Sequence, residues 1–242
     1  MTEPHLRLAT WNIHMGIGLD GRRDLARTAT VIREMLPDLI GLQEVDNSRS
    51  KSGNDLEKLS AWTGLEVVAG PTMQRSTGDY GNVLLTRLPV VDVERYDLSV
   101  KQREPRGLML AHLDWYGERL QVAVTHLGLR AGERREQVRR LIECLSTSDR
   151  TPLILMGDFN EWFVWGRPRR WLERHFHQLR SPATFPSRRP VFGLDHILAD
   201  PPERLGDRQV FKSELARIAS DHLPLIATYF HRPGHPLRLA PD

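Results

Sequence analysis

Cysteine is almost absent from this sequence of 242 residues, in which Cys144 stands alone. A single cysteine excludes an intramolecular disulfide and fits a reducing compartment, although a secreted protein without bridges would look the same. No run approaches the roughly 20 apolar residues that a membrane-spanning helix needs, and the first residues lack a basic segment followed by an apolar one. We therefore expect no signal peptide, no stable membrane insertion and a cytoplasmic location.

A strong charge of either sign is also lacking. The formal net charge is +3, and hydrophobic and charged residues make up 40% and 27% of the chain, as in an ordinary soluble globular protein. The arginines are nevertheless clustered and could contact a polyanion or an anionic membrane surface, although for the first cluster we favour a solvated helix face. The clusters are Arg130, Arg134, Arg135, Arg139 and Arg140, then Arg167, Arg169, Arg170 and Arg174, then Arg188 and Arg189.

Short apolar runs alternate with helical patterns along the chain. Many strands with few helices predict an α+β protein in which sheets form the centre and helices cover them. We find no linker, repeat or heptad run, so we predict one domain over 5–230, a flexible tail over 231–242 and a monomer. The predicted strands are Leu6–Thr10, Leu39–Leu42, Val83–Leu85, Val90–Val93, Leu108–Leu113, Leu120–His126, Leu153–Met156, Leu194–Leu198 and Leu225–Tyr229. The predicted helices are Asp24–Leu36, Asp55–Trp62, Glu133–Leu145 and Pro168–His175.

Polar residues repeatedly follow these apolar runs. Strands that each deliver a carboxylate, amide or imidazole to their ends build a shared cleft at one edge of the sheets. Taken singly, each residue has another interpretation, such as a turn, a surface acid or a buried histidine. Taken together, they predict an active site. The residues are Asn12, Glu44, His126, Asp158, Asn160, Asp195, Asp221 and His222.

The order of the motifs around these residues resembles that of the endonuclease/exonuclease/phosphatase superfamily. Its members include pancreatic-type deoxyribonucleases, abasic-site endonucleases, inositol polyphosphate phosphatases and neutral sphingomyelinases. The resemblance extends from about Leu6 to Tyr229 and implies a four-layer α/β/β/α sandwich of two packed mixed β-sheets flanked by helices. The motifs are Trp11-Asn12, Leu42-Gln43-Glu44, Thr125-His126-Leu127, Gly157-Asp158-Phe159-Asn160, Leu194-Asp195-His196 and Ser220-Asp221-His222-Leu223-Pro224. A closer resemblance, to bacterial members of unsettled substrate, rests on His126-Leu127-Gly128-Leu129-Arg130, Asp158-Phe159-Asn160-Glu161-Trp162 and Thr184-Phe185-Pro186.

Such enzymes hydrolyse phosphate esters with a divalent metal ion. The reaction needs charge neutralised on the phosphoryl oxygens, an activated water and donors for the transition state. Hard oxygen ligands suit Mg²⁺ or Mn²⁺. The resemblance implies Glu44 as the principal metal ligand, with Asn12 helping to hold the metal or its water. Asp221 would complete the metal site directly or through water.

The remaining motif residues are predicted to be catalytic. His222 is a general base or a phosphate clamp, and Asp195 orients it and raises its basicity. Asp158 is the competing base, and Asn160 donates to a phosphoryl oxygen. His126 protonates the leaving oxygen or donates to the phosphate, and the resemblance associates a histidine here with the deoxyribonuclease and lipid-phosphoesterase branches rather than with the abasic-site endonucleases.

Four further residues are candidates for substrate binding. Arg103 or Arg106 precedes a strand where the deoxyribonuclease branch has a phosphate-binding arginine, and Arg106 is slightly favoured over Arg103. A plain surface arginine before an edge strand is an equal alternative. Asn82 resembles a cleft-lining position, or is a turn asparagine. Trp162 could stack on a base, enter a lipid interface or belong to the core.

The natural substrate is left open by the sequence. We expect a nuclease-like phosphodiesterase acting on nucleic acid, with a phospholipid head group or another small phosphate ester as the alternative. A non-catalytic binding protein is the third interpretation. His14 is expected in an exposed loop, and His196 is expected to be buried on the face opposite Asp195.

Overall fold

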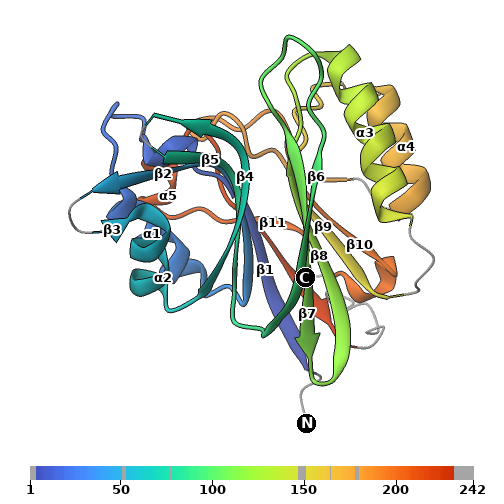
Figure 1. Cartoon of the computed structure of the whole chain (residues 1–242), viewed down its shortest axis with the longest axis horizontal. Coiled ribbons are helices and arrows are strands. Elements are labelled where there is room, and N and C mark those ends of the chain that lie inside the picture. The colour runs from blue at the N-terminus through green and yellow to red at the C-terminus, as the bar shows by residue number, and fades with distance from the viewer. Residues whose placement is uncertain are drawn as a thin grey trace, which may run out of the picture.

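The computed structural model describes residues 4–50, 53–76, 78–146, 151–163, 165–177 and 180–231. Two β-sheets lie face to face at its centre (Figure 1). The predicted flexible tail lies outside the described residues except for His231, and the single domain over 5–230 stays a prediction.

The larger sheet has seven strands in the order β11-β12-β1-β2-β5-β4, with β3 paired to β2. Strand β1 runs parallel to β2 and antiparallel to β12, so the sheet is mixed. These strands are β1 (His5–Asn12), β2 (Leu39–Ser50), β3 (Gly53–Asn54), β4 (Glu66–Arg75), β5 (Gly78–Thr86), β11 (Gln209–Val210) and β12 (Leu225–Phe230).

The second sheet has five strands in the order β10-β9-β8-β7-β6. Only its central pair, β8 and β9, is parallel, so this sheet is also mixed. The strands are β6 (Val90–Asp97), β7 (Gly107–Trp115), β8 (Glu118–His126), β9 (Leu153–Asp158) and β10 (Asp195–Asp200).

Helices cover the outer face of each sheet. Helices α1 (Leu25–Met35) and α2 (Asp55–Thr63), with the short α5 (Ala216–Ala219), pack on the seven-stranded sheet, and α3 (Ala131–Leu145) and α4 (Arg167–Phe176) pack on the five-stranded one (Figure 1). Alternate strand residues face either the helices or the other sheet, as the period of two requires. Leu8, for example, lies between the sheets, whereas Ala9 faces the helices. The predicted α/β/β/α sandwich is confirmed.

Local sequence explains where α1 begins and ends. The Asp24 carboxylate accepts a hydrogen bond from the Arg27 backbone N–H at 2.9 Å, which caps the helix. Ala29 and Ile32 bury the face turned to the sheet. Leu36 then adopts a left-handed conformation, and Pro37 prevents a further helical turn.

The predicted strands and helices are all confirmed, and four elements were missed. They are β3, β4, β11 and α5, together with the 3₁₀ turns η1 (His14–Gly16) and η2 (Pro202–Arg204). In the described part of the chain, no helix has the length and apolarity that crossing a membrane requires.

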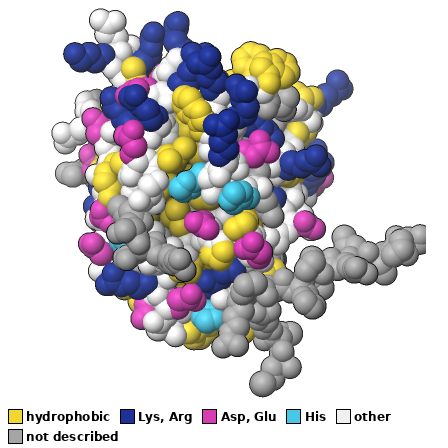
Figure 2. Space-filling view, turned by 90° about the vertical axis from the view of Figure 1, so that its right-hand side faces the viewer, with side chains coloured by type: hydrophobic (Ala, Val, Ile, Leu, Met, Phe, Trp, Pro, Cys, Tyr) yellow, Lys and Arg dark blue, Asp and Glu magenta, His cyan; other side chains and the backbone are white. Residues whose placement is uncertain are grey.

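The register of the strands brings their polar ends to one edge of the molecule. His126 and Asp195 are both paired with Asp158 in the five-stranded sheet, and Asn12 is paired with Gln43 in the larger one. This edge lies at the top of Figure 1, where β1 and β9 end. On the face seen in Figure 2, Lys and Arg side chains gather toward the same upper end, with hydrophobic side chains among them.

Candidate active site

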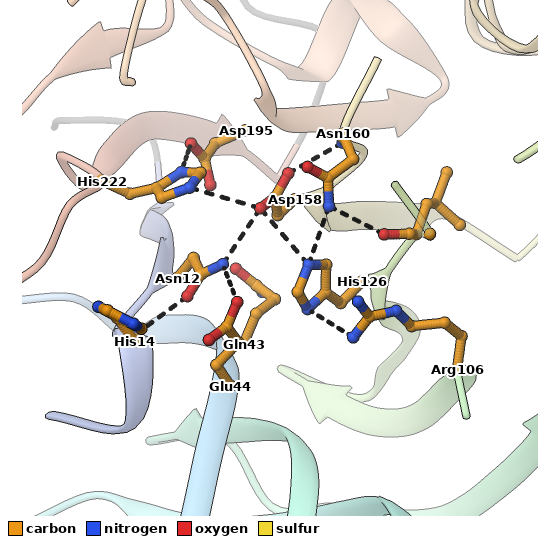
Figure 3. A network of polar contacts seen from close by, with 12 residues as sticks. Asn12, His14, Gln43, Glu44, Arg106, His126, Asp158, Asn160, Asp195 and His222 are labelled. Carbon is orange, nitrogen blue, oxygen red and sulfur yellow. Dashed lines mark hydrogen bonds and ion pairs between the residues drawn. The ribbon is translucent and has the colours of Figure 1, made fainter. Parts of the chain in front are cut away.

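At the site, the side-chain amide of Asn12 links the two sheets by hydrogen bonds to two carboxylates, those of Glu44 and Asp158. Asn12, at the end of β1, donates from Nδ2 to Glu44 Oε1 at 2.9 Å and to Asp158 Oδ2 at 3.1 Å. Its Oδ1 accepts from the His14 backbone N–H at 3.0 Å, which fixes the orientation of the amide. Figure 3 shows these residues around a shared space, with His126 and His222 facing Asp158 from opposite sides.

Unusual backbone conformations present two of the predicted site residues. Glu44 has a φ of 57° at a bulge in the pairing of β2 with β5, and Asn160 has a φ of 49°. Positive φ is uncommon outside glycine and asparagine, and it concentrates at functional sites. Gly157 has a φ of 154°, and a Cβ there would lie 1.9 Å from the Thr125 carbonyl oxygen. Only glycine therefore lets β9 bring Asp158 to this position.

His222 lies between two carboxylates. Its Nδ1 is 2.8 Å from Asp195 Oδ2, and its Nε2 is 3.6 Å from Asp158 Oδ2. Burial lowers the pKa of His222, but Asp195 and Asp158 outweigh burial and raise this pKa to about 10. The two carboxylates therefore favour the imidazolium form of the ring.

Asp158 is fully enclosed at the centre of the site. Burial raises the pKa of Asp158 to about 7; Asp195 acts in the same direction, while His222 opposes it. Its Oδ1 accepts from the Asn160 backbone N–H at 2.9 Å, which fixes the carboxylate plane. A carboxylate with a pKa near neutrality can exchange protons at physiological pH.

His126 has a different environment, although it is equally buried. Its Nδ1 is 3.3 Å from Arg106 Nη1, and its Nε2 is 3.0 Å from Asn160 Nδ2 and 3.5 Å from Asp158 Oδ2. Burial, followed by the cations Arg106 and His222, holds the pKa of His126 well below its ordinary value. The two site histidines therefore differ in charge.

Among the described residues, two groups of three side chains have the spacing of metal ligands, namely Asp92, Glu94 and His112 on β6 and β7, and Asp158, Asp195 and His222 in the site. Asp158, Asp195 and His222 bring ligand atoms within 4.8 Å of one another, but hydrogen bonds and ion pairs already join them. Glu44, half-buried beside Asn12, and Asp221, whose side chain is 38% exposed, offer carboxylate oxygens at the open side of the site. Hard oxygen donors fit Mg²⁺ or Mn²⁺. Glu44 and Asp221, whose carboxylates are not enclosed by ion pairs with His222, therefore suit the expected metal better than Asp158 and Asp195.

His14 lies at the edge of this open side in the 3₁₀ turn η1 and is half-exposed, whereas an exposed loop was expected. Its Nδ1 is 3.9 Å from Asp221 Oδ1. His196 is buried and stacks on Phe159 with ring centroids 4.8 Å apart, on the face of β10 turned away from the site. The prediction of burial for His196 is confirmed.

The predicted substrate-binding residues lie in contrasting settings. Arg106 is buried and donates to Glu104 at 3.0 Å, whereas Arg103 is exposed. Asn82 is also buried and donates to the Gly107 carbonyl oxygen at 3.2 Å, so it ties β5 to β7. Trp162 is half-buried at the rim of the site.

The aromatic residues near Trp162 connect the rim to the site. Trp162 packs edge-on against Phe185 and Phe192, and the Phe185 ring centroid lies 4.8 Å from that of His222. Phe163 and Trp165 point outward, with 49% and 71% of their surface exposed. Trp162 is therefore packed at the rim and lies outside the hydrophobic core, and Phe163 and Trp165 form an exposed aromatic surface.

The first arginine cluster was expected to form a solvated helix face, and this is wrong for Arg134. Arg135 and Arg139 lie on the solvated face of α3, as predicted, but Arg134 is buried. Arg134 forms a buried ion pair with Glu161 at 3.3 Å and donates to the Leu129 carbonyl oxygen at 2.7 Å. It thereby joins the loop that follows His126 to the loop that follows Asn160.

Sequence reasoning missed three residues that shape the site. Thr184 donates to Asp195 Oδ2 at 2.5 Å, and its only sequence signal was the Thr184-Phe185-Pro186 motif. Glu104 holds the Arg106 guanidinium. Tyr80 is buried close enough to Glu44 and Glu104 that burial and then both carboxylates raise the pKa of its phenol. No spacing in the sequence connects Tyr80 with either acid.

Comparisons with known proteins concern the family and the fold of the chain. The model of the Endonuclease/Exonuclease/phosphatase family matches residues 9–222. The chain is 29% identical to YbhP of Escherichia coli, an uncharacterized protein, over 91% of this chain and 94% of that one. Two solved structures share the fold. An endonuclease/exonuclease/phosphatase from Beutenbergia cavernae is 24% identical with a TM-score of 0.75, covering 93% of this chain and 71% of that one. The human nocturnin catalytic domain with bound sulfate is 22% identical with a TM-score of 0.72, covering 94% of each chain.

Proposed function

The chain belongs to the endonuclease/exonuclease/phosphatase family, and on that premise we propose that it is a divalent-metal-dependent phosphodiesterase. The observation that carries the proposal is the position of Asp158. Its carboxylate lies within 3.6 Å of side-chain nitrogens of Asn12, at the end of β1, of His126, at the end of β8, and of His222, in the segment before β12. The nitrogen donors can bind a phosphoryl group, and the buried carboxylate among them can accept a proton beside it.

The partly exposed carboxylates of Glu44 and Asp221 support metal dependence. A Mg²⁺ or Mn²⁺ ion held through Glu44, with Asn12 and Asp221 beside it, would neutralise charge on the phosphoryl oxygens. Asn12 positions Glu44 by the 2.9 Å hydrogen bond from Nδ2. Glu44 lies at a bulge within β2, and its side chain points toward Asn12 and the site (Figure 3).

Asp158 is the proposed base, and His222 is the proposed phosphate clamp. Because His222 is held between Asp195 and Asp158, it is already protonated at neutral pH and has no free nitrogen to accept a proton. Its Nε2–H can donate to a phosphoryl oxygen and counter the charge that develops there. Asp158, with a pKa near 7, is left to take the proton of the attacking water.

Nucleic acid is the first candidate substrate. Exposed arginines lie in loops that connect the strands and on the first turn of α4, so they can contact a polyanion that passes over the site. Phosphate contacts of this kind bind a backbone without reading its sequence. The arginines are Arg103, Arg130, Arg167, Arg170, Arg188 and Arg189.

A phospholipid head group is the second candidate, because Phe163 and Trp165 are exposed at the same rim. Aromatic side chains at a loop tip can enter the interfacial region of a bilayer while nearby arginines meet the head groups. The same aromatic rings can also stack on unpaired bases. We further propose a cytoplasmic monomer, and size-exclusion chromatography tests the oligomeric state.

A substrate panel tests the proposed function. Wild type and Asp158→Asn are offered plasmid DNA, single-stranded RNA and mixed phospholipid vesicles, each with Mg²⁺, Mn²⁺ or EDTA. We expect metal-dependent cleavage of a diester by wild type and almost none by Asp158→Asn. Faster cleavage of nucleic acid supports the first candidate. Faster cleavage of vesicles that is lost in a Phe163→Ser/Trp165→Ser variant supports the second, and the absence of cleavage from the whole panel contradicts both.

A further inference from the structure

The ring of His126 has a hydrogen-bond donor at each nitrogen. Arg106 Nη1 lies 3.3 Å from Nδ1, and Asn160 Nδ2 lies 3.0 Å from Nε2. A neutral imidazole has one N–H donor and one acceptor nitrogen. Only one of the two contacts can therefore be a hydrogen bond to His126, and the position of the ring proton decides which.

The orientation of both neighbours is fixed. A guanidinium can only donate, and Arg106 is held by its Nη1 bond to Glu104 at 3.0 Å and by a backbone bond from its N–H to Ser99 Oγ at 3.2 Å. The Asn160 amide donates to the Leu127 carbonyl oxygen at 2.9 Å, so its nitrogen faces the ring. Exchanging the amide atoms of Asn160 would break that bond.

The charges around the ring select one tautomer. With the proton on Nδ1, an N–H would face the Arg106 cation and find no acceptor there. With the proton on Nε2, the Nδ1 lone pair faces the cation. The Nε2–H then meets the neutral Asn160 amide nitrogen at 3.0 Å, a smaller cost than facing a cation, and it points to the side where the Asp158 Oδ2 acceptor lies at 3.5 Å. We propose that Arg106 is a positioning residue that fixes His126 as the neutral Nε2–H tautomer. His126 then donates a hydrogen bond toward the reacting phosphate and transfers no proton.

The two site histidines thus receive partners of opposite charge. Asp195 faces Nδ1 of His222 and makes that ring a cation, whereas Arg106 faces Nδ1 of His126 and keeps that ring neutral. A neutral imidazole gives up its remaining N–H proton with great difficulty, so His126 stabilises charge instead of protonating a leaving group. The catalytic part of this inference rests on the proposed function, but the tautomer does not.

Nuclear magnetic resonance tests the tautomer directly. Long-range ¹H–¹⁵N correlation spectra of ¹⁵N-histidine-labelled protein at pH 7.5 distinguish the Nε2–H, Nδ1–H and charged forms, and His126→Gln assigns the signal. We expect the Nε2–H form in wild type. In Arg106→Met, Asn160 becomes free to donate to Nε2, so the proton should move to Nδ1. Arg103→Met, a matched change at an exposed arginine nearby, should leave the tautomer unchanged.

The wild-type spectrum is decisive even if Arg106→Met does not fold. An Nδ1–H or charged His126 in wild type would overturn the proposal. An unchanged Nε2–H signal in folded Arg106→Met would also overturn it, because another group would then fix the tautomer.

Activity tests the catalytic consequence. The amide nitrogen of Gln reaches the position of Nε2, so His126→Gln should keep activity within about tenfold of wild type, whereas His126→Ala should lose about 100-fold or more. The losses should be equal for bis-p-nitrophenyl phosphate and for a dinucleotide, whose leaving group is poor. A much larger loss on the dinucleotide would show proton transfer and refute this part. If wild type hydrolyses neither substrate, the proposed function fails while the spectra still report the tautomer.

Discussion

Asp195 Oδ2 accepts a hydrogen bond from Nδ1 of His222 at 2.8 Å, and both side chains are almost excluded from solvent. The same oxygen accepts a second hydrogen bond, from the hydroxyl of Thr184, at 2.5 Å. Asp195 therefore both orients the ring of His222 and favours its charged form. Removing the negative charge of Asp195 while keeping its shape separates these two effects.

Asp195→Asn keeps a side chain of the same shape and removes the charge. The pKa of His222, which the carboxylates raise to about 10, should fall toward its ordinary value. Because the imidazolium is then lost as pH rises through that lower value, activity should decline between pH 7 and 9, where wild type does not lose it. We expect a loss of about 10–100-fold at pH 8.5 and a smaller loss at pH 6. Parallel pH–rate profiles would contradict the role given to Asp195.

The buried ion pair of Arg134 and Glu161 should be needed for stability. Their side chains are 1% and 6% exposed, so Arg134→Met leaves an uncompensated carboxylate in the protein interior. The expected loss in the free energy of unfolding is about 3–5 kcal/mol, measured by urea denaturation. Arg134→Met/Glu161→Leu should recover much of it, because no charge is then buried. Arg135→Met, on the exposed face of α3, should change stability by less than about 0.5 kcal/mol. Equal effects of Arg134→Met and the double change would argue against a charge effect.

His196 should make stability depend on pH. Burial lowers the pKa of His196 to about 3 in the folded protein, whereas the unfolded chain protonates near the ordinary value of about 6.5. As pH falls from 6.5 to 3, the unfolded state therefore binds the proton first, and the free energy of unfolding decreases by up to about 1.4 kcal/mol per pH unit. His196→Leu should flatten this dependence between pH 6.5 and 4. An unchanged slope would mean that His196 is already charged in the folded protein.

The sequence allowed the layers and most elements to be predicted because hydrophobic periodicity is local. Strand β4 was missed because Gly70 and Pro71 interrupt its middle, where the structure has a pairing irregularity instead of a turn. Strands β3 and β11 have two residues each, and α5 has four. Segments this short carry no measurable period.

The site was predicted in outline because its motifs follow strand ends. Its electrostatics were not predictable, because they depend on contacts distant in the chain. Arg134 and Glu161 are 27 residues apart, and Arg106 and His126 are 20 apart. No local pattern shows that one histidine faces a carboxylate and the other a guanidinium, although this difference decides their charges.

The dependence of hydrolysis on a metal ion and on Glu44 is the most direct test of the proposed function. Turnover of bis-p-nitrophenyl phosphate is measured with EDTA, Mg²⁺ and Mn²⁺ for wild type and Glu44→Gln, and circular dichroism confirms that both are folded. We predict turnover by wild type with either metal, none with EDTA, and a loss of about 100-fold or more in Glu44→Gln that higher metal concentration partly restores. Equal turnover by the two proteins, or turnover that EDTA does not affect, would contradict the proposed function.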